Sequence, residues 1–242
     1  PETGPPEVPA GWSSPCCAFV TIMRGCNYSC SYCIVPAVRG REIYRPIETI
    51  LKETRARAAA GAKEITLLGQ TVNSYRVHDG TRTIRFPELL RRVGSIEGIE
   101  RVRFESPHPY FLDDALIAAM AETPTVCEQM HLPAQSGSDR LLKIMRRNYD
   151  AGLFLEKAAR LRAAIADVEV STDIIVGFPS ESEDDFKRTL DLVEALRPSW
   201  SYTFKYSPRE GTEAASMDDD VPPDVKEDRL QRLNSLCDAL TE

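Results

Sequence analysis

The chain has 242 residues, of which 42% are hydrophobic and 28% charged, and its net charge at pH 7 is −7. This balance is typical of a soluble globular protein with one sizeable core and excludes a largely disordered chain. The negative charge argues against a surface that grips nucleic-acid phosphates throughout. No apolar run approaches the roughly 20 residues of a membrane span.

The first residues, PETGPPEVPAGWSS (1–14), are rich in proline and glycine, and this composition is typical of a linker. Because the chain begins at Pro1 and not at methionine, we expect a domain excised from a longer protein or a processed chain. We assign 1–14 to the linker and 15–242 to a single domain.

Strand and helix signals alternate along the rest of the chain. Apolar or β-branched runs predict strands at 18–23, 64–69, 99–104, 128–132, 168–178 and 200–206. Apolar periodicity and terminal residues predict helices at 46–60, 86–93, 113–121, 139–146, 152–166, 183–196 and 224–240. Strict alternation predicts parallel strands with helical crossovers. We favour an α/β fold that is an open, partial β/α barrel of about six strand–helix units over a doubly wound sheet, because polar residues follow several strands.

Three of the seven cysteines cluster after the first predicted strand, as Cys26, Cys30 and Cys33 in a C-x₃-C-x₂-C pattern. A cubane cluster takes one thiolate per iron, so three thiolates leave one iron open to a chelating ligand. The spacing therefore predicts an iron–sulfur metal site. A zinc site with a borrowed fourth ligand is the alternative, although the histidines show no finger-like spacing to these cysteines.

A C-x₃-C-x₂-C loop after the first strand of an α/β barrel resembles the radical S-adenosylmethionine (radical SAM) superfamily. Further segments are similar to its methylthiotransferase family: VRGREIYRP (38–46), LLGQTVNSY (67–75), SPHP (106–109), HLPAQSGSDRLLKIMRRNY (131–149), TDIIVGFPSESEDDF (172–186) and YSPREGT (206–212). Two of them, LLGQTVNSY and HLPAQSGSDR, resemble the MiaB-type branch that acts on tRNA. The similarity extends over nearly the whole chain from about Ser14 onward.

The resemblance implies two cofactors, a [4Fe–4S] cluster held by the three cysteines and S-adenosyl-L-methionine bound at the open iron. Polar and glycine positions at the ends of the second, fourth and fifth predicted strands are the candidates for binding S-adenosylmethionine: Gly69, Gln70, Gln135, Ser136, Arg146 and Gly177. Ordinary loop capping is the alternative role for each of them. The sequence points to no catalytic side chain.

Two positions depart from the family pattern. Tyr44 stands where the family usually has serine, and Ser180 where it usually has glycine. Neither supplies a thiolate, so both bear on local loop geometry and leave the chemistry unchanged. The acidic run Glu181, Glu183, Asp184 and Asp185 is interpreted as a charge bias at the start of a helix.

The leading hypothesis is the radical SAM core of a tRNA-processing transferase, a methylthiotransferase that modifies position 2 of N6-isopentenyladenosine beside the anticodon. The resemblance implies a cytoplasmic enzyme that binds tRNA in its full-length form, has no membrane association and takes electrons from a donor such as flavodoxin or ferredoxin. Family members also carry an N-terminal second-cluster domain and a C-terminal RNA-binding domain, and we expect this sequence to contain neither. We therefore expect the chain alone only to cleave S-adenosylmethionine.

Two alternatives remain open at this point. A sister branch of the family methylthiolates an aspartate of a ribosomal protein, and it shares the fold. A non-catalytic interaction domain with bound zinc would use the same three cysteines without any S-adenosylmethionine.

Overall fold

The computed structural model describes residues 16–241, and these fall into two compact units. The first comprises the described chain up to Cys26 together with Gly40–Glu128. The second comprises Asn27–Arg39 and the described chain from Gln129 onward. The linker expected at 1–14 lies outside the described residues.

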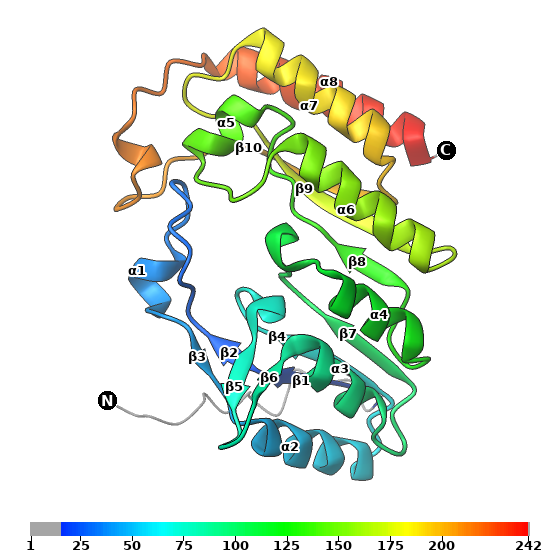
Figure 1. Ribbon diagram of the computed structural model, residues 1–242. Coiled ribbons are helices and arrows are strands. Elements are labelled where there is room, and N and C mark those ends of the chain that lie inside the picture. The colour runs from blue at the N-terminus through cyan, green and yellow to red at the C-terminus, as the bar shows by residue number, and fades with distance from the viewer. Residues whose placement is uncertain (1–15, 242) are drawn as a thin grey trace. The chain divides into compact units, whose positions relative to one another are not determined.

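The first unit is built on a parallel three-stranded sheet in the order β1-β4-β7 (Figure 1). Its strands are β1 (Cys17–Thr21), β4 (Glu64–Leu68) and β7 (Arg101–Phe104). Ala18 lies opposite Ile65, and Ile65 lies opposite Val102, so the three strands are in continuous register. Ile65 and Val102 are fully buried, as expected for β-branched side chains of a sheet that is covered by helices.

The helices of the first unit begin and end at residues suited to those positions. They are α2 (Ile47–Ala59), α3 (Phe86–Gly94) and α4 (Asp114–Glu122), with short 3₁₀ turns η1 (Val72–Ser74) and η2 (Pro109–Phe111). Pro46 precedes α2, and Asp113 caps α4 by accepting a hydrogen bond of 2.9 Å from the amide of Leu116. Two small antiparallel pairs join β2 (Met23–Arg24) to β3 (Ile43–Tyr44) and β5 (Arg76–His78) to β6 (Thr83–Arg85).

The second unit contains the other parallel sheet, with β9 between β8 and β10 (Figure 1). Its strands are β8 (Gln129–His131), β9 (Glu169–Val176) and β10 (Trp200–Lys205). Val170, Ile174 and Val176 of β9 are fully buried. The central strand therefore carries the core, and its carboxyl end leads directly into the turn at Gly177.

Helices of the second unit are α1 (Val35–Arg39), α5 (Asp139–Ile144), α6 (Ala151–Ala164), α7 (Glu183–Leu196) and α8 (Pro223–Thr241), with the 3₁₀ turn η3 (Ala214–Ser216). Ser138, Asp150 and Ser182 cap α5, α6 and α7 through their side-chain oxygens. At α7 the side chain of Asp185 returns to the amide of Ser182 and completes a capping box. Helices α7 and α8 contact each other.

The predicted strands and helices are confirmed, with ends displaced by a few residues at most. All six main strands are parallel within their sheets, as the alternation of strands and helices predicted. The two antiparallel pairs and α1 were not predicted, because strands of two or three residues and a helix of 5 residues are too short to show a hydrophobic period.

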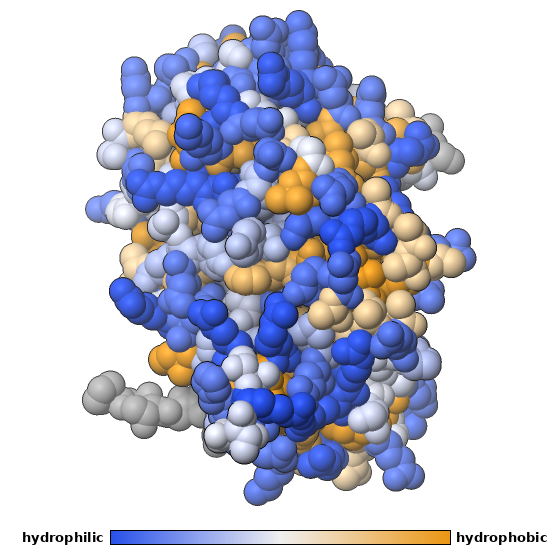
Figure 2. Space-filling view, viewed as in Figure 1, coloured by the Kyte–Doolittle hydropathy of each residue, from blue (hydrophilic) through white to orange (hydrophobic). Residues whose placement is uncertain are grey.

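The described helices were compared with the length and apolar composition of a membrane span. Among the helices of residues 16–241, none has both the length and the apolar composition that crossing a bilayer requires. The face drawn in Figure 2 is mostly hydrophilic, with hydrophobic side chains in scattered patches.

Candidate functional site

The cysteine loop begins in the first unit, where Gly25 and Cys26 follow β2. Gly25 has a φ of +79°, and a Cβ there would lie 2.2 Å from the carbonyl oxygen of Arg41, so only glycine fits. The amide of Gly25 donates a 2.6 Å hydrogen bond to Oε1 of Gln70, and the amide of Cys26 donates to the carbonyl of Gly40 at 3.0 Å. The sulfur of Cys26 lies 3.6 Å from Oγ1 of Thr71. The segment after β4 thus holds the entry to the loop.

Gly69 and Gln70, two of the predicted cofactor contacts, both stand at that carboxyl end of β4. A Cβ on Gly69 would lie 2.5 Å from Cγ of Met23, so the glycine allows the strand end to pack against β2. The side-chain oxygen of Gln70 is engaged by the amide of Gly25. These contacts give both residues a role in shaping the loop, and their contact with a cofactor stays a prediction.

Cys30 and Cys33 belong to the second unit and form a turn, in which the amide of Cys33 donates to the carbonyl of Cys30 at 3.0 Å. Between them, the backbone amide of Ser31 donates to the carbonyl of Met145 at 3.2 Å. The carbonyl of Ser31 accepts a hydrogen bond from the amide of Ala214 at 2.8 Å. All three loop cysteines are partly buried thiols. The turn is therefore fixed by backbone contacts to the end of α5 and to η3.

Tyr32, next to Cys33, packs its ring against a buried apolar cluster of the second unit. The ring packs edge-on against Phe178, with centroids 6.4 Å apart. Burial raises the pKa of Tyr32 well above its ordinary value, so the phenol stays protonated. Tyr32 thus places an uncharged aromatic ring beside Cys33 and against Phe178.

Arg147 was not among the residues singled out from the sequence, yet it contacts a cysteine of the loop. Its Nη1 lies 3.5 Å from the sulfur of Cys30, its Nε donates to the hydroxyl of Tyr149 at 2.8 Å, and its Nη2 donates to the carbonyl of Pro133 at 3.3 Å. The guanidinium also lies over the ring of Tyr149, 5.0 Å from its centroid. A fixed positive charge is thereby placed beside the Cys30 sulfur.

The neighbouring Arg146, which the sequence did point to, is oriented differently. Its backbone has a φ of +56°, and its guanidinium forms an ion pair with Glu213 while remaining half exposed. Arg146 and Arg147 therefore point to different partners. The RRNY run was the only signal of a basic group here, and it does not say which arginine turns inward.

Gln135 and Ser136 lie in the turn that follows β8. Gln135 has a φ of +69°, and its main chain pairs with β9: its backbone amide donates to the carbonyl of Asp173 at 2.7 Å, and its carbonyl accepts from the amide of Ile175 at 2.9 Å. The hydroxyl of Ser136 is fully buried, lies 3.3 Å from that of Thr189 and accepts the amide of Ser138. Both residues order the turn before α5, and their contact with a cofactor stays a prediction.

Gly177 begins the turn after β9. Its φ is +68°, and a Cβ there would lie 2.3 Å from Cγ of Lys226. Its amide donates a 2.5 Å hydrogen bond to Oε2 of Glu181. Ser180 has a φ of +67°, which explains physically why the resembling family usually has glycine at this position. Gly177 and Ser180, at the two ends of the turn, thus both adopt the left-handed backbone conformation.

The acidic run after this turn is more than a charge bias. Glu181 is fully buried in its side chain and pairs with Arg229 at 2.8 Å. Asp185 accepts hydrogen bonds from the hydroxyls of Ser138 and Ser182, at 2.5 and 2.7 Å, and pairs with Arg140 at 2.5 Å. The interpretation as a favourable charge at the start of a helix holds for Glu183 and Asp184, which are exposed. It does not account for Glu181 and Asp185, which are buried.

The candidate residues divide between the units. Cys26, Gly69 and Gln70 belong to the first, whereas the remaining candidates belong to the second: Cys30, Cys33, Gln135, Ser136, Arg146 and Gly177. Within residues 16–241, no group of three or more His, Cys, Asp or Glu side chains is arranged to hold a metal ion. The donor set itself, three partly buried thiols on one loop with a guanidinium at Cys30, fits an iron–sulfur cluster.

Comparison with known proteins identifies close relatives. Residues 20–193 match the family model of the Radical SAM superfamily. The chain is 51% identical over 238 residues to the tRNA-2-methylthio-N(6)-dimethylallyladenosine synthase of Bifidobacterium longum (strain DJO10A), covering 98% of this chain and 49% of the relative. It is 51% identical to the enzyme of that name from Thermobifida fusca (strain YX), covering 100% of this chain and 49% of the relative. The chain thus spans about half the length of these relatives.

Solved structures share the fold at low sequence identity. Coproporphyrinogen III oxidase (HemN) from Escherichia coli, a radical SAM enzyme, matches with a TM-score of 0.68 and 16% identity over 93% of this chain and 53% of that one. The radical S-adenosylmethionine methyltransferase TsrM from Kitasatospora setae matches with a TM-score of 0.65 and 16% identity over 81% of this chain and 38% of that one. Together with the parallel strands and their helices, these matches confirm the partial β/α barrel.

Proposed function

Because this chain belongs to the radical SAM superfamily, we propose that it is the radical-forming domain of a tRNA methylthiotransferase. The observation that carries the proposal is the C-x₃-C-x₂-C loop, set in a chain that is about half identical, over nearly all its length, to tRNA-2-methylthio-N(6)-dimethylallyladenosine synthases. The zinc alternative explains the three thiols and leaves the rest of this similarity unexplained.

Cys26, Cys30 and Cys33 would hold a [4Fe–4S] cluster, with one iron left for the amino and carboxylate groups of S-adenosylmethionine. The chemistry that a reduced cluster would supply there is one electron for reductive cleavage of the sulfonium bond, which would give methionine and a 5′-deoxyadenosyl radical. The protein contributes orientation and exclusion of water. Gln70 fixes the loop entry through Gly25.

The rest of the site supports the same reaction. Arg147 holds a positive charge beside the sulfur of Cys30 and would favour a bound anionic cluster. Tyr32 and Phe178 pack together at the turn that carries Cys30 and Cys33, and we propose that these rings limit the access of water to the site. Gly69, Gln135, Ser136, Arg146 and Gly177 are proposed to contact S-adenosylmethionine.

We propose that the radical removes hydrogen from position 2 of an N6-isopentenyl (dimethylallyl) adenosine next to the anticodon, where a methylthio group is then added. The names of the relatives support tRNA as the partner and this base as the substrate. A flavodoxin or ferredoxin is proposed as the electron donor, and the cytoplasm as the site of action. We assign 15–242 as one radical SAM domain made of the two compact units.

The proposal is tested first by reconstituting the chain anaerobically with iron and sulfide, reducing it with dithionite and supplying S-adenosylmethionine. We expect about four irons per chain and release of 5′-deoxyadenosine. Cys30→Ala should abolish this release, whereas the matched Cys237→Ala, in α8 and outside the loop, should keep it. Zinc in place of iron, together with no cleavage, would overturn the assignment.

The substrate is tested with the full-length protein and tRNA from cells that lack this modification. Nucleoside analysis should then show 2-methylthio-N6-isopentenyladenosine. A product on a ribosomal protein and none on tRNA would place the enzyme in the sister branch.

A further inference from the structure

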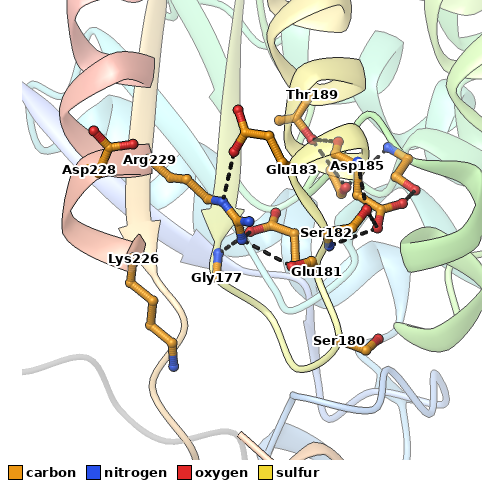
Figure 3. A network of polar contacts seen from close by, with 12 residues as sticks. Gly177, Ser180, Glu181, Ser182, Glu183, Asp185, Thr189, Lys226, Asp228 and Arg229 are labelled. Carbon is orange, nitrogen blue, oxygen red and sulfur yellow. Dashed lines mark hydrogen bonds and ion pairs between the residues drawn. The ribbon is translucent and has the colours of Figure 1, made fainter. Parts of the chain in front are cut away.

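We propose that Arg229 of α8 is a positioning residue that holds the Gly177 turn in its S-adenosylmethionine-binding conformation, acting through the buried carboxylate of Glu181. The inference rests on the proposed function for the identity of the ligand. The contacts that carry it lie entirely within the second unit. Figure 3 shows them as one connected network between α8, the turn and the start of α7.

One oxygen of Glu181 joins the helix to the turn. Oε2 accepts both the amide of Gly177, at 2.5 Å, and Nη1 of Arg229, at 2.8 Å. The same Nη1 also donates to the backbone carbonyl of Glu181, at 3.1 Å. A guanidinium thus fixes the carboxylate and the main chain of Glu181 together, and the carboxylate in turn fixes the amide that begins the turn.

Burial makes this arrangement depend on both partners. The side chain of Arg229 is 6% exposed and that of Glu181 is 0% exposed. Burial raises the pKa of Glu181, while the Gly177 amide and Arg229 oppose that rise. Without the guanidinium the carboxylate would be an isolated buried charge, and it would take up a proton or turn toward water. Either response releases the amide of Gly177.

Lys226, one helical turn before Arg229, packs against Gly177. The aliphatic stem of Lys226 fills the space where a Gly177 side chain would begin. Its ammonium pairs with Asp219 at 2.6 Å and lies 5.4 Å from the ring centroid of Tyr206. Helix α8 therefore touches the turn from two successive helical turns, which defines both the position and the hydrogen bonding of Gly177.

The location of the turn connects it with ligand binding. In β/α folds, ligands bind at the carboxyl ends of parallel strands, and Gly177 directly follows β9, the central strand of its sheet. Phe178, the next residue, contacts Tyr32 of the cysteine loop. Since the amide of Gly177 is occupied by Glu181, the contribution of the network is the shape of the turn and not a hydrogen bond to the ligand.

Arg232, one turn beyond Arg229, provides a matched control on the same helix. It also pairs with a carboxylate of this network, Glu183, at 2.6 Å, and its guanidinium lies 4.7 Å from the ring centroid of Phe186. Its side chain is 39% exposed, and its ion pairs are with Glu183 and Asp228. Loss of Arg232 should leave the turn unchanged.

The test compares four reconstituted proteins: wild type, the apolar pair E181L/R229L, the neutral pair E181Q/R229M and the control R232M. Two quantities are measured, amide hydrogen exchange across 177–180 and the dissociation constant for S-adenosylmethionine. In E181L/R229L the ion pair is replaced without a buried charge, so the protein should fold while the Gly177 amide has no acceptor. We expect exchange there to quicken, and binding to weaken, by about ten-fold.

E181Q/R229M keeps a side-chain amide oxygen that can accept from Gly177, so its exchange rate and dissociation constant should lie closer to those of wild type. R232M should have the wild-type value of both. Wild-type affinity in E181L/R229L would overturn the proposal, as would unchanged exchange at Gly177. If E181L/R229L does not fold, R229K is measured in its place, because lysine keeps the charge but cannot bond the carboxylate and the carbonyl of Glu181 in the same way. Wild-type exchange and affinity in R229K would then overturn the proposal. If wild type itself binds no S-adenosylmethionine, the proposed function fails while the exchange data still report on the network.

Discussion

The guanidinium of Arg147 lies 3.5 Å from the sulfur of Cys30, in a place where its other nitrogens are held by Tyr149 and Pro133. These two contacts fix its orientation, so the charge cannot swing away from the cysteine. The adjacent Arg146 is bonded to Glu213 and half exposed. Two consecutive arginines thus have separate environments, and their substitutions should have separate effects.

Substitution of Arg147 by methionine should slow cleavage of S-adenosylmethionine by about 10- to 100-fold, the usual cost of losing a group that supports a metal ligand. The residue also bonds to Tyr149, so the thermal midpoint is measured alongside. Arg160→Met, at a half-exposed arginine of α6 that pairs with Glu156, is the control and should leave cleavage nearly unchanged. Equal losses in the two variants, with equal iron content, would show that proximity to Cys30 has no special effect.

Gly177→Ala should destabilise the protein by about 1–3 kcal/mol, because the residue has a φ of +68° and its new Cβ would meet Lys226. Gly152→Ala is the control. Gly152 lies in α6, and the nearest atom to an added Cβ is 3.5 Å away, so alanine should stabilise the helix by up to about 1 kcal/mol. Urea unfolding measures both. A stable Gly177→Ala variant would contradict the packing seen at the turn.

Ser180→Gly should stabilise the protein by about 1 kcal/mol, since serine pays a steric cost at a φ of +67° that glycine does not. The hydroxyl of Ser180 accepts a 3.1 Å bond from Arg140, but this contact is exposed and contributes little. Ser180→Ala is the control that removes the hydroxyl and keeps the strain. Unfolding curves should show a higher free energy of unfolding for Ser180→Gly than for wild type, and an equal or lower one for Ser180→Ala. A Ser180→Gly variant less stable than wild type would contradict the strain argument.

Asp185 should make stability fall in acid. Burial alone would raise its pKa, but hydrogen bonds from Arg140, Ser138 and Ser182 outweigh it and hold the pKa well below the ordinary 3.8. A carboxylate with a depressed folded-state pKa contributes stability above its unfolded pKa and loses it as pH falls toward the folded value. The free energy of unfolding of wild type should therefore drop below about pH 4 relative to Asp185→Asn.

Glu181 works in the opposite direction, because its folded pKa is raised by burial. Its contribution is largest below the unfolded pKa and decreases as pH rises through the folded value. Glu181→Gln should thus narrow the stability difference between mildly acidic and neutral pH. Parallel pH profiles for wild type and both variants would show that neither carboxyl is linked to folding.

The order of strands and helices could be read from the sequence because each element is long enough to show its period, as in β9 and α7. The cysteine motif was equally accessible, since its ligands are separated by only a few residues. Arg147 was missed because α5 ends at Ile144 and the backbone reverses at Arg146, a local φ choice that no periodicity encodes. Burial of Glu181 was missed because its partner Arg229 is distant in sequence and adjacent only in the fold.

The second unit is discontinuous, since Asn27–Arg39 packs with the chain from Gln129 onward. Ser31, between two of the loop cysteines, is bonded to Met145 and to Ala214, both of which a ribosome makes long after it. During synthesis, which proceeds from the N-terminus, the cysteines emerge well before the surfaces that shape their turn. Delivery of iron and sulfur to a properly formed loop must therefore wait until the β10–α8 connection has left the exit tunnel.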